Sequence, residues 1–223
     1  MLMEANGSLT SRAYAAFRAD ILGGVLPPGG KLKVEELRDR YRIGAAPIRE
    51  ALTLLVADGL VERADQRGFR VVDVSEHEFE ELLRTRCWLE ERALRESIAR
   101  GGTEWEEGIV LAFFRLSREP RSQAADRFVE NPAWEARHKA FHDALIAACA
   151  SSILLRYCRQ LYDQNVRYRR IAGLAAHPSR DVTNEHRAIM DATLDRNADA
   201  AAALLIAHYT RTGNFLRPAL PPG

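Results

Sequence analysis

Hydrophobic residues recur at helical spacing through the first part of the chain. Over residues 9–22 they lie three or four positions apart, and the stretch GGVLPPGG then ends this helix. A second helix is predicted over 34–41, and a third begins three residues later with APIREALTLLVADGL, which makes a helix-turn-helix pair. The segment LVERADQRGFRVVDV predicts a two-stranded hairpin whose turn holds Arg67 and Gly68. Residues 1–75 are therefore expected to form a winged helix.

After this segment the pattern is helical only. Ser75 and Glu78 form a capping box at the start of a long amphipathic helix that ends at Gly101 and Gly102. Further helices are predicted from 103 onward, over about 131–150, 152–171, 181–196 and 198–215. The fold class is thus mainly α: an N-terminal winged helix (1–75), an all-α bundle of six or seven helices (76–217) and a loose tail (218–223).

Composition and charge exclude several classes of protein. The chain has 223 residues, of which 47% are hydrophobic and 28% charged, as expected for a folded globular protein. The net charge of +1 does not identify a partner, because one helix can carry a local DNA-binding face. Three single cysteines suggest neither a disulfide framework nor a thiolate zinc site. Without a signal-peptide pattern or a membrane-length apolar run, a cytoplasmic location is expected.

Several motifs resemble a known family. ILGGVLPPGGKL, PIREALTLLVADGLVER and RGFRV resemble the N-terminal domain of GntR-type bacterial transcription regulators. RTRCWLEERA, WEARHKAFHDALIAAC and NEHRAIMDATLDRNADAAAALLIAHY resemble the FCD effector domain of the FadR branch, most closely that of carbon-starvation-type regulators. The resemblance implies a homodimer that binds double-stranded operator DNA and whose helical domains bind a small metabolite. It implies a regulator rather than an enzyme, and the leading hypothesis is a metabolite-responsive repressor.

The third helix and the hairpin carry the candidate DNA contacts. Arg49 lies in the first two turns of this recognition helix, where a guanidinium reads guanine, and the resemblance also places the arginine of the REAL motif on DNA. A surface ion pair with Glu50 or Asp58 is the alternative. The full expected set is Lys33, Arg42, Ala46, Pro47, Arg49, Arg67 and Gly68. Where many relatives have a Ser-Arg-Thr-like run, this chain has GAA, so its operator sequence is expected to differ.

Four of the six histidines are candidates for one metal site. His138 and His142 lie at i and i+4, on one face of one helix. His186 and His208 both lie eleven residues from Asn197, so an antiparallel helical hairpin brings them to the same height. Imidazole clusters without thiolate suit divalent transition metals, with zinc or nickel expected here. The alternative is a set of histidines without metal.

The resemblance supports a metal-binding effector domain at these four positions, although many relatives carry Asp where this chain has His138. It also implies that Arg86 faces the cavity, where it could grip a small carboxylate, dicarboxylate or hydroxy acid. A salt bridge to Glu90 is the alternative role for Arg86. Arg167 and Tyr168, in NVRYRR, are the expected second part of the effector site, although the sequence alone does not show which side chains of this stretch, Arg169 included, face inward.

Two other functions share features with this sequence. Histidines at i and i+4 are typical of zinc proteases, but the HExxH motif needs a Glu directly after the first His, and this chain has Lys139 there. An enzyme is therefore not expected. A DNA-binding dimer without effector response remains open; it predicts that no metabolite changes the affinity for DNA.

Overall fold

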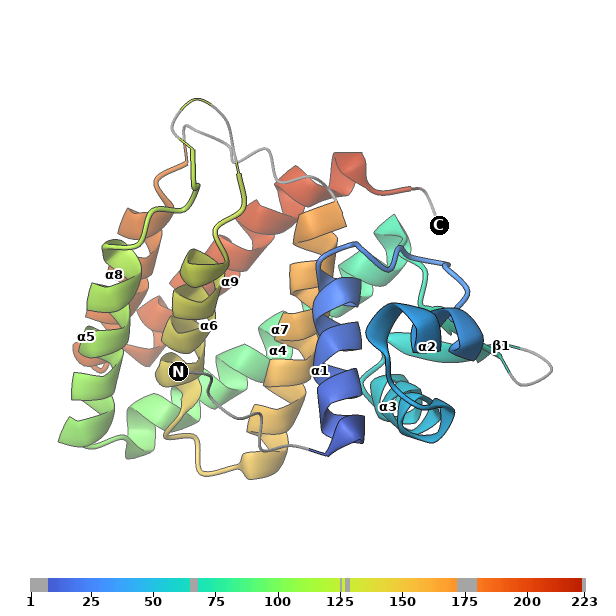
Figure 1. The fold of residues 1–223 in the computed structure, drawn as a ribbon. Helices are drawn as coiled ribbons and strands as arrows, with labels where there is room; N and C mark the ends of the chain where they lie inside the picture. Colours follow the sequence, from blue (N-terminus) through green and yellow to red (C-terminus); the bar gives the residue numbers. More distant parts are fainter. Residues whose placement is uncertain (1–7, 65–67, 125, 127–128, 172–179, 222–223) are drawn as a thin grey trace.

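The computed structural model describes residues 8–64, 68–124, 126, 129–171 and 180–221. Its N-terminal unit contains α1 (Leu9–Leu22), α2 (Val34–Tyr41), α3 (Ala45–Ala57), β1 (Val61–Ala64) and β2 (Gly68–Val71). The two strands pair antiparallel, with Val61 opposite Val71. In Figure 1 these elements form a separate unit at one end of the molecule. The expected winged helix is confirmed.

The second unit is an all-α bundle, as expected. It contains α4 (Glu76–Arg100), α5 (Thr103–Ser117), α6 (Pro132–Ile146), α7 (Ser152–Ile171), α8 (Val182–Leu194), α9 (Ala198–Leu216) and the short 3-10 helix η1 (Arg217–Ala219). Helix α4 packs against α7 and α9, whereas α5 packs against α6 and α8 (Figure 1). Among the described residues, no helix is both long enough and apolar enough to span a membrane.

Side-chain caps define the starts of several bundle helices. The Ser75 hydroxyl accepts a hydrogen bond from the backbone N–H of Glu78, so the capping residue at the domain boundary acts as predicted. Asn131 caps α6 and Asn197 caps α9 in the same way. Because α8 ends a few residues before Asn197, the chain reverses sharply there and α8 and α9 pack as a hairpin.

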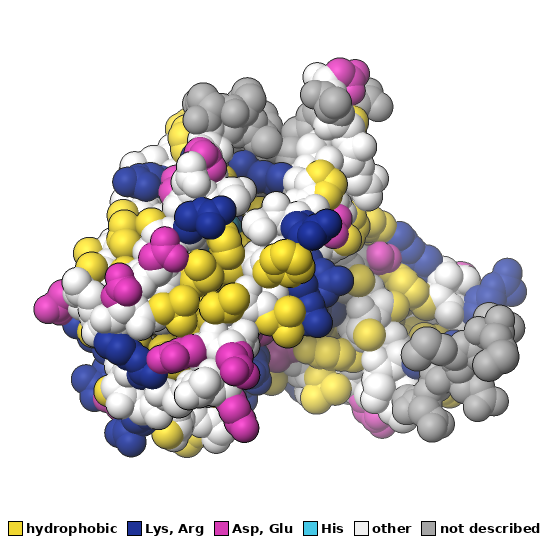
Figure 2. All heavy atoms as spheres, turned by 90° about the vertical axis from the view of Figure 1, so that its left-hand side faces the viewer, with side chains coloured by type: hydrophobic (Ala, Val, Ile, Leu, Met, Phe, Trp, Pro, Cys, Tyr) yellow, Lys and Arg dark blue, Asp and Glu magenta, His cyan; other side chains and the backbone are white. Residues whose placement is uncertain are grey.

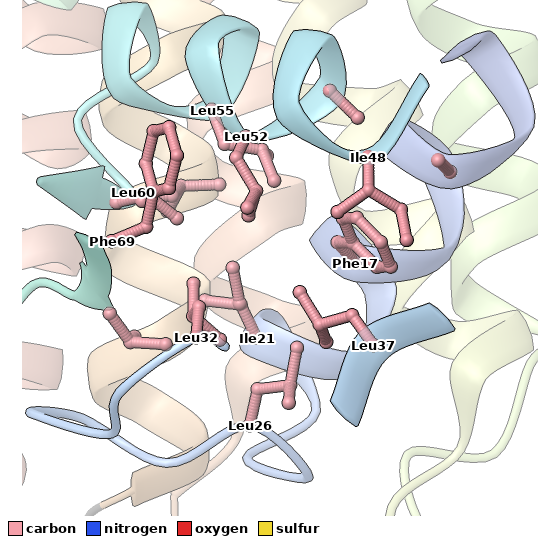
Figure 3. Packing of buried hydrophobic residues seen from close by; sticks show 14 of the residues in the cluster. Phe17, Ile21, Leu26, Leu32, Leu37, Ile48, Leu52, Leu55, Leu60 and Phe69 are labelled. Carbon is pink, nitrogen blue, oxygen red and sulfur yellow. The ribbon is translucent and has the colours of Figure 1, made fainter. Parts of the chain in front are cut away.

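The winged helix has its own hydrophobic core. Phe17 of α1 and Ile48, Leu52 and Leu55 of α3 are fully buried, and Figure 3 shows them directed toward one another and toward Phe69 of the hairpin. A unit with this much buried apolar surface holds the recognition helix rigidly, which is needed for reading DNA.

The described part of the C-terminal tail is not loose, and the expectation for 218–223 is corrected there. Leu220 is buried against a cluster that includes Phe79 and Leu216, and the Pro221 carbonyl accepts a hydrogen bond from the Glu76 N–H at 3.0 Å. The apolar Leu220 side chain gains free energy by leaving water, and this holds the segment against the start of α4.

Polar contacts join the two units along α7. Asp163 forms one ion pair with Arg18 of α1 and another, at 3.1 Å, with Lys139 of α6. Gln160 and Gln164 donate hydrogen bonds of 3.1 Å to the backbone carbonyls of residues 57 and 58, at the C-terminal end of α3. Helix α7 therefore contacts the helix that bears the recognition residues.

Leu52→Ala tests the core of the winged helix. We expect the free energy of unfolding of this unit to fall by about 2 to 5 kcal/mol, because the truncation leaves a cavity at a fully buried site. Urea denaturation followed by circular dichroism measures the change. Leu54→Ala is the matched control on the same helix: Leu54 is 49% exposed, so its loss should cost about 0.5 kcal/mol or less. Equal effects of the two changes would contradict the burial of Leu52 in the core.

Candidate metal centre and anion pocket

The four predicted histidines meet inside the bundle. His138 and His142 come from α6, His186 from α8 and His208 from α9, and all four side chains are buried. One ring nitrogen from each lies within 4.8 Å of the corresponding nitrogens of the other three. The rings of His186 and His208 have centroids 4.6 Å apart, which agrees with the equal-height argument from the sequence. The geometry thus provides four ligand atoms around one point.

A tyrosine and a carboxylate orient His142. The Tyr209 hydroxyl donates its hydrogen to Glu90 and lies 2.9 Å from Nδ1 of His142. A phenol has one hydrogen and a carboxylate only accepts, so the second bond has Nδ1–H of His142 as donor. Nε2 of His142 then carries a lone pair and faces the centre of the cluster.

The same arrangement orients His138. The Tyr162 hydroxyl donates to Glu135 at 2.7 Å and accepts from Nδ1–H of His138, also at 2.7 Å. Nε2 of His138 therefore also carries a lone pair, and it lies 3.1 Å from Nε2 of His142. Two nitrogen lone pairs this close repel each other unless a cation or a proton lies between them. The donor set therefore fits a metal ion.

His208 and His186 each also have a ring nitrogen available as a metal ligand. Nδ1–H of His208 donates to Glu185 at 2.8 Å, which leaves Nε2 of His208 free to act as a ligand. Nε2 of His186 is buried and makes no hydrogen bond within the described part of the protein. A buried ring nitrogen without a partner carries an energetic cost that a metal ion would remove.

Burial keeps the cluster uncharged. It lowers the pKa of His138, His142 and His186 well below the ordinary histidine value, and the neighbouring imidazoles lower these pKa values further. Burial also lowers the pKa of His208 to about 4, although the hydrogen bond to Glu185 opposes the shift. At neutral pH all four rings are therefore neutral, which is the form that binds metals.

A pocket adjoins the cluster. His138, His208 and Tyr209 line it together with four arginines: Arg86, Arg121, Arg169 and Arg180. The pocket therefore joins the candidate metal ligands to a concentration of positive charge.

Three of these arginines have carboxylate partners. Arg86 binds Glu90 at 2.6 Å, as the sequence suggested, and Asn165 at 3.1 Å, while its second terminal nitrogen is buried without a partner in the described structure. Arg169 pairs with Glu135 and Arg180 with Glu185, each at 2.6 Å. Arg86 also stacks on the ring of Tyr209, with its guanidinium carbon 3.9 Å from the ring centre.

Arg121 makes the pocket cationic. Its guanidinium lies over the Trp134 ring and forms no ion pair with any described residue. Burial lowers the pKa of Arg121, and the nearby charges of Arg180 and Arg169 lower this pKa further. Positive groups that repel one another inside a pocket attract an anion, because the anion relieves the repulsion.

The structure does not bring Arg167 and Tyr168 to the histidines. They line a different hollow, which also contains Gly59, Glu78 and Leu82 and lies between α4, α7 and the winged helix. At 100° per residue along a helix, positions 162, 165 and 169 share one face of α7, whereas 167 and 168 lie on other faces. Arg169 therefore lies in the pocket, where the sequence predicts its neighbours Arg167 and Tyr168.

Several site residues had no signal in the sequence. Tyr162, Tyr209, Glu185, Arg121 and Arg180 are ordinary members of amphipathic helices or loops. Two of them adjoin a predicted ligand in sequence, but Tyr209 follows His208 and yet contacts His142. Their roles depend on contacts between helices, which spacing along one helix does not reveal.

The candidate DNA contacts lie on the exposed side of the winged helix. The Arg49 side chain is exposed, and the two carboxylates that could have paired with it are engaged elsewhere: Glu50 accepts from Thr10, and Asp58 from Tyr14. The guanidinium of Arg49 is therefore free of the alternative ion pairs considered from the sequence.

The other candidate DNA contacts differ in their surroundings. Ala46 is exposed and Pro47 half-buried in the first turn of α3. Arg42 is exposed and ends α2 with a left-handed φ of 54°, and Lys33 pairs with Glu36 at 2.7 Å. Gly68 begins β2, and Arg67 lies outside the described residues.

Comparisons with known proteins agree with this architecture. Residues 9–71 match the model of the bacterial regulatory proteins of the gntR family, and residues 81–211 match the FCD domain. The HTH-type transcriptional regulator BphR of Paraburkholderia xenovorans is 39% identical over 94% of this chain and 86% of its own length. The HTH-type transcriptional repressor GlaR of Escherichia coli is 34% identical over 87% of this chain and 90% of its own.

A solved structure shows the same fold. Escherichia coli McbR has a TM-score of 0.76 at 19% identity, over 94% of this chain and 97% of that protein. The family models together cover most of the sequence, and the relatives are regulators of transcription rather than enzymes. The chain belongs to the gntR family of bacterial regulatory proteins, as a DNA-binding transcription regulator with an FCD effector domain.

Proposed function

We propose that this regulator is a metabolite-responsive repressor. In this proposal a homodimer binds operator DNA through its two winged helices, and each effector domain holds a divalent transition metal and a small carboxylate. The name of the 34% identical relative supports repression. The observation that carries the effector site is the pair of facing lone pairs on His138 and His142, next to a cationic pocket.

The proposed metal is zinc or nickel, held by His138, His142, His186 and His208. Imidazole nitrogen suits both ions, and the hydrogen bonds from Nδ1 to tyrosine or glutamate would hold three of the rings in ligand orientation. Because all four ligands are neutral, the full charge of the ion is kept. When bound, the metal would supply a Lewis-acidic positive charge that attracts a carboxylate oxygen.

The proposed effector is a small carboxylate, with a dicarboxylate or hydroxy acid as the working class. Arg86 has one terminal nitrogen free for it, and Arg121 has no carboxylate partner among the described residues. Arg169, which the structure brings into the pocket, joins this set in place of Arg167 and Tyr168. A guanidinium grips a carboxylate through paired hydrogen bonds, which favours this class over neutral metabolites.

Helix α7 offers a route from the pocket to DNA. Arg169 lines the pocket and Tyr162 contacts His138, whereas Asp163 and Gln164 bind the winged helix. Lys139, next to His138 on α6, shares Asp163 with α1. An effector that favours one position of α6 and α7 therefore favours one position of the winged helix, and the affinity for DNA changes by linkage.

Arg49→Ala should weaken specific DNA binding. Loss of one base-reading guanidinium is expected to cost about 1 to 3 kcal/mol of binding free energy. Fluorescence anisotropy on a duplex selected from a random-sequence pool measures the affinity at fixed salt. Arg100→Ala removes an exposed arginine at the far end of α4 and should leave the affinity unchanged. An unaltered affinity for Arg49→Ala would refute its assigned role.

His142→Ala should abolish metal binding. Inductively coupled plasma mass spectrometry of tag-free protein, loaded with zinc or nickel and desalted, should give about one ion per wild-type chain. The His142→Ala protein should retain much less, whereas His77→Ala, which removes an exposed histidine of α4, should match the wild type. If the wild type retains neither ion, the metal is excluded from the proposal and the DNA-binding function stands.

Arg121→Ala should weaken effector binding. Isothermal titration of the zinc-loaded protein with a panel of mono- and dicarboxylates should identify a ligand. The variant should bind this ligand about 10- to 100-fold more weakly, as expected for a lost hydrogen bond between charged groups. Arg137→Ala, on the exposed face of α6, is the matched control and should bind normally. If no member of the panel binds or changes operator affinity, the chain is a DNA-binding protein without this effector response.

A further inference from the structure

Helix α5 exposes an apolar surface on the side of the bundle away from the winged helix. Val110 and Leu111 are 47% exposed and Phe114 is 53% exposed, although each is large and hydrophobic. Figure 2 shows this side of the molecule, where hydrophobic side chains gather in a patch with acidic and basic groups around it. Contiguous apolar surface of this kind is typical of a protein–protein contact.

Exposed residues of α5 and its C-cap, Arg118, form a stripe along the helix. Positions 104, 107, 108, 111, 114, 115 and 118 are all exposed, and at 100° per residue they lie within about a third of the helix circumference. Ile109, Phe113 and Leu116 lie on the opposite face and are buried in the bundle. One apolar face of α5 therefore packs against its own domain. The helix also has a second, exposed apolar face, which nothing in the described chain covers.

Charge is ordered along this stripe. Glu104 and Glu107 lie at its start, Leu111 and Phe114 in its middle, and Arg115 and Arg118 at its end. Glu104, Glu107 and Arg115 form no ion pair with any described residue of the chain. The stripe thus has one acidic end and one basic end with an apolar centre.

We propose that the α5 stripe binds the α5 stripe of a second copy of this chain, antiparallel and about a two-fold axis at Leu111. Glu104 and Arg118 both lie seven residues from Leu111, or about 10 Å at 1.5 Å per residue, so they face each other across the axis. Glu107 and Arg115 lie four residues from it and also face each other. Acidic groups of each copy thus meet basic groups of the other.

The apolar centre fits the same register. Phe114 and Gly108 both lie three residues from Leu111, so Phe114 of one copy faces Gly108 of the other. Apart from its chain neighbours and the backbone of its own helix, no described atom lies within 4 Å of the position that a Cβ at Gly108 would occupy, which leaves room for an aromatic ring. Leu111 meets its own counterpart on the axis. One register therefore satisfies the charged, the bulky and the small positions together.

The most exposed aromatic side chain among the described residues of the bundle does not fit such a contact. Trp88 of α4 is 62% exposed, but Arg84 and Arg92 lie four residues before and after it and are also exposed. A two-fold contact centred on Trp88 would place these arginines opposite each other, and like charges repel. The charge pattern thus favours α5 over α4 as the self-contact.

This inference rests on the proposed homodimer and assigns the dimer interface to α5. Because α5 lies on the side of the bundle away from the winged helix, the contact leaves both α3 helices free for DNA (Figure 1). A single helix pair buries less than the roughly 800 Å² per partner of a standard interface. The proposal therefore implies that α8, which packs beside α5, contributes to the same face.

Charge reversal in the full-length protein tests the register. Glu107→Arg places two arginines opposite each other at both symmetric positions, and Arg115→Glu places two glutamates there. We expect each single variant to raise the dimer dissociation constant about tenfold, measured by analytical ultracentrifugation. The double variant Glu107→Arg/Arg115→Glu restores opposite charges and should return to near the wild-type value.

Mixing the two single variants provides a second test. In a heterodimer of Glu107→Arg with Arg115→Glu, an arginine faces a glutamate at both symmetric positions. We therefore expect an equimolar mixture to form heterodimers of near wild-type affinity. Trp88→Ser is the matched control and should dimerise normally. The restored double variant and the mixture also show that the single variants are folded.

The outcomes distinguish a failure of the α5 interface from a failure of the proposed homodimer. A wild-type dimer that neither reversal weakens would overturn the α5 interface and leave the dimeric regulator intact. Weakening without recovery in the double variant or the mixture would refute the antiparallel register, and dissociation of Trp88→Ser would assign the interface to α4. A wild type that remains monomeric at high concentration would refute both the interface and the proposed homodimer.

Discussion

The packing of α7 between the two units is the constraint on which the architecture depends. One face of α7 supplies Asn165 and Arg169 to the pocket and Tyr162 to His138, and other faces supply Asp163 and Gln164 to the winged helix. A helix is rigid over its length, so a side chain on one face does not move far without moving those on the others. Helix α7 thus contacts both the DNA-binding unit and the effector pocket.

The pocket is polar at a position where a hydrophobic core would be more stable. Buried imidazoles and guanidinium groups lose their hydration, and the chain offsets this loss with carboxylates placed beside them. Glu90 binds both Arg86 and Tyr209, and Glu135 binds both Arg169 and Tyr162. Each carboxylate therefore neutralises an arginine and orients a histidine through a tyrosine. Such a network is costly to build, which argues for a binding function rather than a structural one.

The two outer surfaces of the protein have different physical characters. The winged helix presents an exposed guanidinium, Arg49, that no carboxylate of the described residues neutralises, as suits a polyanionic partner. Helix α5 instead presents balanced charges around an apolar centre, as suits a partner with the same surface. Because the two surfaces face different directions, contact with one partner leaves the other site accessible (Figure 1).

Local sequence determined the elements and half of the candidate site. Hydrophobic periodicity and capping residues predicted the helices. The i to i+4 spacing predicted that His138 and His142 lie together, and the equal distances from Asn197 predicted that His186 and His208 lie together. Only the tertiary structure decided that Arg169 faces the pocket, that the tail packs on α4, and that Tyr209 orients His142 from 67 residues away. These features depend on how helices rotate and cross, which is set by side-chain packing between segments distant in sequence.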